Sequence, residues 1–237
     1  MISRALIELY SREGVARAFA FRGGTALHKL FLPVPARYSE DIDLVQRDSG
    51  AIGPALAEIR CCLDSWLGEP TWKQSRNSVA LVYRFDATGL PIQRMRLKVE
   101  INTREHFALR GWREREASVA NPWFSGNARI VTYSADELLA TKLRALYQRR
   151  NGRDLYDLAL ALDSIAVNDE TVATCFAEYL SREGNAISRV SFEANLQDKL
   201  RSPQFLEDIH PLLPAATVYD PSRASEVVRT RLIARLA

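Results

Sequence analysis

Two aspartates separated by one residue are the strongest chemical signal in this sequence. They lie in the run Asp41-Ile-Asp43-Leu, in which polar and apolar residues alternate as they do in a half-buried strand. On such a strand Asp41 and Asp43 point to the same side, while Ile42 and Leu44 point into the core. Two carboxylates held this close repel each other unless a cation lies between them, and oxygen ligands favour Mg²⁺ or Mn²⁺. The alternative is a solvated strand end without a metal.

A pair of glycines stands just before a predicted helix in the run Phe21-Arg-Gly-Gly-Thr25. Gly23 and Gly24 allow backbone N–H groups to approach a phosphate closely, and the N-terminus of a helix favours an anion. Thr25 is expected to cap that helix, which should cover residues 26–31. The run lacks the Gly-Lys-Ser/Thr of a Walker A loop. Taken alone, the turn is weak evidence for phosphate binding.

A third polar group lies on the alternating segment 93–102. Lys98 and Glu100 share the polar face of this predicted strand, so Glu100 is able to supply a third carboxylate. The alternative is a cross-strand ion pair on an exposed face. The apolar face of the same strand consists of Met95, Leu97, Val99 and Ile101.

The elements that must position these groups fall into two parts. The first is mixed: helices are expected over 3–15, 26–31 and 54–67, and strands over 18–21, 41–46, 71–76, 79–86, 93–102 and 129–132. The Arg- and Glu-rich stretch 106–127 is an irregular insertion or a hairpin. The second part is helical, with periodic patterns over 135–150, 153–163, 169–182, 192–200 and 222–236. We therefore expect an α/β (α+β) fold with a mixed, helix-flanked sheet in domain 1–132 and an all-helical domain in 133–237.

The helical part opens with a recognisable start signal. Ser134-Ala-Asp-Glu137 matches a capping box, in which the serine hydroxyl and the Glu137 carboxylate satisfy free N–H groups of the helix. The spacing of Leu139, Leu143 and Leu146 then predicts a buried stripe.

Composition limits the remaining classes of protein. The longest apolar stretches fall far short of the roughly 20 residues that span a bilayer. Cys61, Cys62 and Cys175 make neither a disulfide framework nor a zinc site. We therefore expect a cytoplasmic protein without a membrane partner. The net charge of +3 gives no strong support for a large RNA-binding surface, although Arg110, Arg113 and Arg115 around Trp112 are either an RNA contact or a solvated loop.

Taken together, the motifs have the order found in nucleotidyltransferases. Four motifs resemble those of the AbiEii-type abortive-infection toxins, a family that includes mycobacterial toxin nucleotidyltransferases. They are Phe21-Arg-Gly-Gly-Thr-Ala-Leu27, Arg37-Tyr-Ser-Glu-Asp-Ile-Asp43, Lys98-Val-Glu-Ile101, and Asp136-Glu-Leu-Leu-Ala-Thr-Lys142 with Arg153-Asp-Leu-Tyr-Asp157-Leu. The resemblance covers roughly residues 15 to 165. It implies a two-lobed fold, magnesium, a nucleoside triphosphate donor, often a tRNA 3′ end as acceptor, and a neighbouring antitoxin.

The resemblance also assigns roles to individual residues. Asp41 and Asp43 become metal ligands, and Glu100 either completes the metal site or acts as a base. Lys142 is expected to neutralise the triphosphate across a cleft, and Asp157, with Asp154 on the same helix face, to orient that lysine or the acceptor. The alternative is a structural ion pair between Lys142 and Asp157. The expected nucleotide contacts are Gly23, Gly24, Thr25, Lys98 and Arg37.

Ser39 lies two residues before Asp41 and points to the same side of an extended backbone. A phosphate on Ser39 would add about −1.5 to −2 charge where the donor triphosphate must bind. Ser39 is therefore an expected contact of the nucleotide site and a possible off-switch. The alternative is a serine that only hydrogen-bonds the turn after Tyr38.

Other classes of protein fit the motifs less well. A haloacid-dehalogenase-type phosphatase has a hydrophobic strand leading into its first aspartate, whereas Arg37-Tyr-Ser-Glu precedes Asp41 here. A metal-dependent glycosyltransferase gives no reason for the Gly-Gly turn or for Glu100. The alternatives that remain are transfer to a protein or small-molecule hydroxyl, and a non-catalytic module that binds nucleic acid or an antitoxin. The sequence does not indicate which nucleoside triphosphate is preferred.

Overall fold

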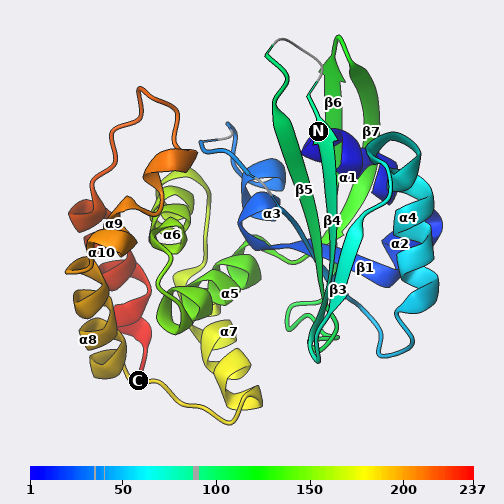
Figure 1. The fold of residues 1–237 in the computed structure, drawn as a ribbon. Coiled ribbons are helices and arrows are strands. Elements are labelled where there is room, and N and C mark those ends of the chain that lie inside the picture. The colour runs from blue at the N-terminus through cyan, green and yellow to red at the C-terminus, as the bar shows by residue number, and fades with distance from the viewer. Residues whose placement is uncertain (35, 40, 88–90) are drawn as a thin grey trace. The chain divides into compact units, whose positions relative to one another are not determined.

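The computed structural model describes residues 1–34, 36–39, 41–87 and 91–237. Glu40, which belongs to the motif around Asp41, lies outside the described residues. Contacts divide the chain into two units: unit 1 comprises Met1–Leu30 and Ser39–Tyr133, and unit 2 comprises Phe31–Tyr38 and Ser134–Ala237. The segment 31–38, which the sequence analysis kept with the sheet, thus groups with the helical unit. Figure 1 labels most of the helices and strands of both units.

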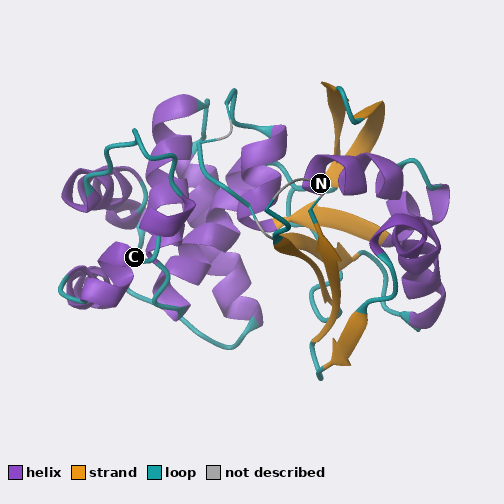
Figure 2. Ribbon diagram, turned by 45° about the horizontal axis from the view of Figure 1, so that its top comes forward, coloured by secondary structure: helices purple, strands orange, loops and turns teal. Residues whose placement is uncertain are grey.

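Unit 1 is built on one mixed sheet, as expected from the sequence. Its strand order is β3-β4-β5-β2-β1-β7-β6, and Figure 2 shows these strands in orange. β2 pairs with β5 and β1 with β7 in parallel, whereas the other neighbours are antiparallel. The strands are β1 (Phe19–Arg22), β2 (Asp41–Gln46), β3 (Thr71–Gln74), β4 (Ser78–Asp86), β5 (Arg94–Asn102), β6 (Arg113–Asn121) and β7 (Phe124–Thr132). The expected fold class, a mixed α/β fold with flanking helices, is confirmed.

One face of this sheet carries the core of unit 1. The helices of the unit are α1 (Ile2–Tyr10), α2 (Glu13–Ala18), α3 (Gly23–Leu30) and α4 (Gly53–Leu67). Tyr83 of β4 points to the α4 side and donates a hydrogen bond of 2.9 Å to Asp64 of that helix. The other buried side chains on this face include Ile42, Leu44, Leu81, Leu97, Val99 and Ile101. Because side chains alternate along a strand, the polar residues of β2, β4 and β5 are left on the opposite face.

One expectation for unit 1 needs correction, and in another the structure selects one of the two alternatives. The predicted helix over 3–15 is two helices, α1 and α2, with a break at Ser11, whose hydroxyl bonds back to the Ile7 carbonyl at 2.7 Å. The stretch 106–127 is largely the hairpin of β6 and β7, closed at Asn121, whose side chain accepts bonds of 3.0 Å from the amides of Trp123 and Phe124. The alternation that marks a strand is missing from β6 because none of its side chains is fully buried.

In unit 2, helices make up the regular structure of the described residues. They are α5 (Ala135–Gln148), α6 (Gly152–Ser164), α7 (Asp169–Arg182), α8 (Arg189–Leu200), α9 (Pro203–Glu207) and α10 (Pro221–Arg231), with 3₁₀ turns at His210–Leu212 and Ile233–Arg235. The predicted leucine stripe of α5 is confirmed, because all three side chains are fully buried. None of the helices in the described ranges is long and apolar enough to cross a membrane.

Half of the predicted capping box is present at the start of α5. The Ser134 hydroxyl accepts a hydrogen bond of 3.2 Å from the Glu137 amide, as expected. The Glu137 carboxylate, however, is fully buried and accepts a bond of 2.8 Å from the Tyr179 hydroxyl of α7. Glu137 therefore joins two helices of the unit, because a buried carboxylate needs a hydrogen-bond donor close by.

Candidate active site

The two aspartates lie on β2 with their side chains on the polar face of the sheet. Both are partly exposed, whereas Ile42 and Leu44 on the same strand are buried, as the alternation predicts. In the parallel pairing of β2 with β5, Asp41 is the partner of Lys98 and Asp43 the partner of Glu100. The two acidic motifs of the sequence are therefore neighbours on adjacent strands.

Gly23 brings the glycine motif to the same place. Its φ of 77° lies in the left-handed region, and a Cβ at this position would stand 2.3 Å from Asp43 Oδ2. Glycine is therefore required both for the backbone conformation and for the close approach of the carboxylate. Because α3 begins at Gly23, the N-terminus of a helix lies directly beside Asp43, and free N–H groups there attract phosphate oxygens.

The helix start differs from the expected one by several residues. Thr25 was predicted to cap a helix that begins at residue 26, but α3 begins at Gly23, so that Thr25 lies within its first turn and is buried. The predicted capping role is therefore wrong, because the left-handed conformation of Gly23 turns the chain into the helix earlier. The contacts predicted for Gly23, Gly24 and Thr25 with a triphosphate stay predictions.

Lys98 holds the acidic cluster together. Its ammonium donates a hydrogen bond to the Glu100 carboxylate. Burial by itself would lower the pKa of Lys98, but this bond and the charges of Glu100, Asp41 and Asp43 outweigh the effect and raise the pKa. A second cation, the Arg96 guanidinium, lies 3.7 Å from Asp41 Oδ1. The polar face thus concentrates negative charge and already attracts cations.

The arrangement suits a magnesium ion bound by two protein carboxylates. Within the described residues, no three His, Cys, Asp or Glu side chains form a ready-made metal cage, and Glu100 is bound to Lys98. Magnesium commonly takes one or two carboxylates and completes its shell with water and substrate phosphates. Asp41 and Asp43 fit this requirement, and the role of Glu100 as a third ligand or base stays a prediction.

Arg22 and Glu105 form a further pair at the site that the sequence analysis did not single out. Arg22 is the cross-strand partner of Asp43 in the pairing of β1 with β2. Its guanidinium donates to the Glu105 carboxylate at 2.6 Å, and both side chains are mostly buried. The position of Arg22 directly before Gly23 could have indicated from the sequence that it belongs to the site. Nothing in the sequence indicated Glu105, because a turn after β5 that Asn102 stabilises brings it to Arg22.

Ser39 precedes β2 and is half-buried. Within the described part of the chain its hydroxyl is enclosed and has no hydrogen-bond partner. The turn hydrogen bond considered as an alternative is thus not seen among these residues. The proposed contact of Ser39 with the nucleotide stays a prediction.

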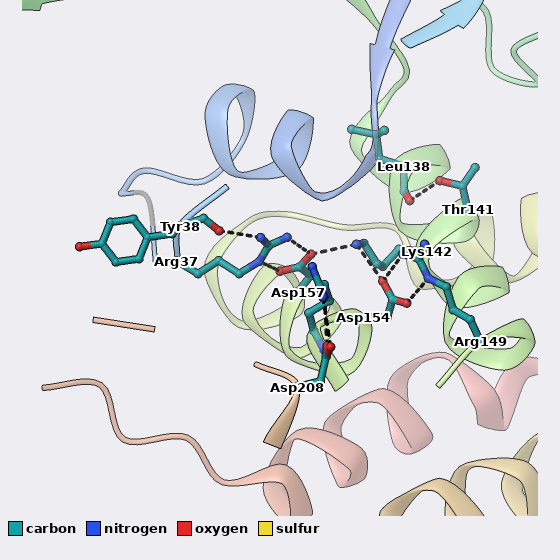
Figure 3. A network of polar contacts seen from close by, with 10 residues as sticks. Arg37, Tyr38, Leu138, Thr141, Lys142, Arg149, Asp154, Asp157 and Asp208 are labelled. Atoms are coloured by element: carbon teal, nitrogen blue, oxygen red, sulfur yellow. Dashed lines mark hydrogen bonds and ion pairs between the residues drawn. The ribbon is translucent and has the colours of Figure 1, made fainter. Parts of the chain in front are cut away.

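In unit 2, the remaining predicted residues form a buried charge network (Figure 3). The Lys142 ammonium of α5 lies 2.9 Å from Asp157 Oδ2 and 3.0 Å from Asp154 Oδ1, both on α6. Arg37 donates through Nε and Nη2 to Asp157 at 2.7 Å, and Arg149 donates to Asp154 at 2.7 and 2.8 Å. Asp154 and Asp157 are fully buried.

The network favours the charged forms of Lys142 and Asp154. Burial opposes the charged form of Lys142, but the carboxylates of Asp157 and Asp154 raise its pKa. Burial likewise opposes ionisation of Asp154, but Lys142 and Arg149 lower the pKa of this carboxyl. The structural ion pair between Lys142 and Asp157, considered as an alternative in the sequence analysis, is therefore present. Contact of Lys142 or Arg37 with a triphosphate stays a prediction.

A mixed sheet that carries a Gly-Gly helix start beside an Asp-x-Asp strand is the arrangement expected of a nucleotidyltransferase. The family described as "Nucleotidyl transferase AbiEii toxin, Type IV TA system" matches residues 4–226. The chain therefore belongs to the AbiEii family of nucleotidyltransferase toxins from type IV toxin–antitoxin systems, which confirms the resemblance seen in its motifs.

Solved structures share the fold. The chain is similar to MenT4, a nucleotidyltransferase toxin of Mycobacterium tuberculosis H37Rv, with a TM-score of 0.72 and 20% identity over 100% of this chain and 82% of that one. It is also similar to a putative nucleotidyltransferase from H. pylori, with a TM-score of 0.59 and 19% identity over 97% of this chain and 90% of that one. JHP933 from Helicobacter pylori matches with a TM-score of 0.56 and 17% identity over 97% and 88%. No curated protein sequence matches the chain.

Proposed function

We propose that this enzyme transfers a nucleoside monophosphate from a nucleoside triphosphate to the 3′-terminal hydroxyl of a tRNA, with Mg²⁺ or Mn²⁺ held by Asp41 and Asp43. In its toxin–antitoxin system the modified tRNA is lost to translation, and an antitoxin counters the effect. Both substrates place this activity in the cytoplasm. Membership of the AbiEii family supports the reaction class. The metal and the acceptor are the parts that need a test.

The approach of Gly23 to Asp43 carries the proposal. A helix N-terminus that binds phosphate and a carboxylate that binds a metal lie within van der Waals distance, because a Cβ on Gly23 would overlap Asp43 Oδ2 at 2.3 Å. The first-turn amides of α3 bind the triphosphate, and Asp41 and Asp43 sit where its phosphate oxygens and the acceptor hydroxyl meet. A divalent cation held by Asp41 and Asp43 would supply positive charge for the phosphates and would lower the pKa of the acceptor hydroxyl.

The cations around this face position the acids. Lys98 and Arg96 offset the repulsion among Asp41, Asp43 and Glu100. Arg22, held by Glu105, places a guanidinium on the strand next to Asp43. These side chains keep the two aspartates in place for the metal and the donor.

The test is incorporation of label from each of the four α-labelled nucleoside triphosphates into total tRNA. We expect label at the tRNA 3′ end with Mg²⁺ or Mn²⁺, and none after chelation. Asp43→Asn should abolish transfer. Asp48→Asn removes the same charge from an exposed residue just beyond β2 and should leave transfer intact. Undiminished transfer by Asp43→Asn contradicts the proposed site.

The acceptor is tested separately. The same labelled triphosphates are offered to a tRNA-free protein fraction and to aminoglycosides. We expect label in the tRNA alone, and loss of that label when the tRNA 3′ hydroxyl is oxidised beforehand. Label in protein or in the small molecule, with none in tRNA, contradicts the proposed acceptor and leaves the reaction class standing.

A further inference from the structure

A row of cations continues from the candidate active site along the same face of the sheet. Lys98, Arg96 and Arg94 follow one another on alternate positions of β5, and Arg84 lies on β4 as the cross-strand partner of Arg96. The step of two residues places neighbouring side chains roughly 7 Å apart, so the row on β5 covers roughly 14 Å of strand. Lys98, at one end of the row, is the cross-strand partner of Asp41 in β2.

The facing arginines are unfavourable for the protein on its own. Like charges directly opposite in an antiparallel pair are destabilising, and Arg84 faces Arg96. Arg84 donates to the neutral Thr71 hydroxyl at 3.0 Å, and within the described ranges it has no ion pair. Arg96 is about half exposed and reaches Asp41 only at 3.7 Å. Arg94 faces Asp86 in the same strand pairing, so one acid stands beside three arginines and a net positive charge remains. An anionic ligand would reduce the repulsion between Arg84 and Arg96.

The row also borders a hollow. Arg84, Arg94 and Arg96 line a space of about 490 Å³ together with Phe85, Asp86 and Met95. Phe85 and Met95 face each other on the opposite side of the two strands, so the arginine side of the hollow is polar. Guanidinium forks match phosphate oxygens in pairs of hydrogen bonds.

We infer that Arg84, Arg94 and Arg96, here named the arginine row, bind the phosphodiester backbone of an RNA strand whose 3′ end leads to Asp41 and Asp43. The inference rests on the proposed function and adds the surface that holds the acceptor. Two features favour RNA over an acidic peptide: the regular spacing of forked cations, and the continuity of the row with the aspartates. The binding surface is local, which agrees with a net charge of only +3 for the whole chain.

The test measures binding of a 5′-fluorescent single-stranded RNA by anisotropy, without nucleoside triphosphate, over a series of salt concentrations. The variant is Arg84→Ala/Arg94→Ala, which leaves the Arg96–Asp41 pair intact. The matched control is Arg17→Ala/Arg76→Ala, which removes the same charge from exposed residues away from the row. We expect at least a tenfold loss of affinity for the first variant at low salt, and none for the control.

The salt dependence gives a second readout. Each phosphate contact with a single strand contributes about 0.7 to the slope of log affinity against log salt, so two lost contacts should make the slope shallower by about 1.4. The melting temperature of the variant without RNA should be equal or higher, because the Arg84–Arg96 repulsion is relieved. A purely structural role predicts a lower melting temperature with unchanged RNA affinity.

Four outcomes overturn the inference: unchanged RNA affinity, an equal loss in the control, loss only in Arg113→Ala/Arg115→Ala, or competition by an acidic peptide but not by RNA. The proposed function fails in a different way. If the wild type binds RNA through the arginine row but transfers no label to tRNA, the surface stands and the reaction does not. If transfer proceeds while the row variant binds and transfers as the wild type does, only the inference fails.

Discussion

Replacement of Lys142 by methionine removes the ammonium that two buried carboxylates share in unit 2. The network in Figure 3 joins three cations, Arg37, Lys142 and Arg149, to Asp154 and Asp157. Its formal charge is therefore +3 − 2 = +1. Loss of Lys142 brings it to zero, whereas Asp157→Asn raises it to +2.

The hydrogen bonds that remain in each variant also predict that Asp157→Asn is more destabilising than Lys142→Met. Without Lys142, Asp157 still accepts two bonds of 2.7 Å from Arg37, and Asp154 still accepts 2.7 and 2.8 Å bonds from Arg149. No carboxylate is stranded, so we expect Lys142→Met to lower the free energy of unfolding by about 1–3 kcal/mol, the usual contribution of a hydrogen bond to a charged group. Asp157→Asn leaves buried Arg37 and Lys142 with too little negative charge, and should cost about 3–5 kcal/mol.

Equilibrium urea unfolding at pH 7 measures both variants. Lys73→Met and Asp163→Asn make the same substitutions at exposed positions and should each change the free energy by less than about 0.5 kcal/mol. A Lys142→Met variant that stays folded also allows transfer to be measured without Lys142. If Asp157→Asn costs no more than Lys142→Met, net buried charge does not set the stability of the network.

Three further predictions concern single positions. Gly23→Ala should abolish transfer and lower the melting temperature, because its Cβ overlaps Asp43 Oδ2, whereas Gly50→Ala, which has open space around it, should do neither; an active Gly23→Ala variant contradicts the close approach. Ser39→Asp should abolish transfer and donor binding because it adds negative charge beside Asp41, and Ser39→Ala should keep both; full activity of the aspartate variant marks a purely structural serine. Burial, aided by the charge of Arg150, lowers the pKa of Lys199 from 10.5 to about 8, so the unfolded chain binds more protons between these values. The free energy of unfolding of the wild type, relative to that of Lys199→Met, should therefore rise from pH 8 to 10.5. A fall over that range contradicts a lowered pKa of Lys199.

Strands with one buried face were predictable from the sequence, because burial imposes alternation on them. β2 and β5 show this pattern, and the residues of the candidate site were predicted from the polar faces of these two strands. For β6 a hairpin was only one of two alternatives, because its residues are exposed or half-exposed along the whole length and nothing selects apolar side chains there. A hairpin of this kind forms through its turn at Asn121 and its backbone ladder.

Long-range pairing was beyond the sequence alone. The motifs predicted that Asp41, Asp43 and Glu100 share a site, but only the parallel register of β2 and β5 places Lys98 opposite Asp41. Arg37 is a second example. Its contact with a phosphate was expected from the family resemblance and stays a prediction. Nothing in the sequence indicated that its guanidinium donates to Asp157 and to the Tyr38 carbonyl within unit 2.

The charged cluster on the sheet and the Lys142 network differ in their exposure to solvent, which decides whether a cluster is able to exchange its partners for a ligand. On the sheet, Asp41, Glu100 and Lys98 keep about a third of their side-chain surface exposed, so these groups stay solvated and exchange partners at low cost. The Lys142 network is sealed, with 7% exposure for the lysine and none for its two aspartates. Moving Lys142 to a ligand breaks two buried ion pairs, whereas a divalent cation at Asp41 and Asp43 only supplements Lys98 and Arg96. We therefore propose that the sheet face carries the exchangeable chemistry of this enzyme. The ion pairs of the buried network join α5, α6 and Arg37.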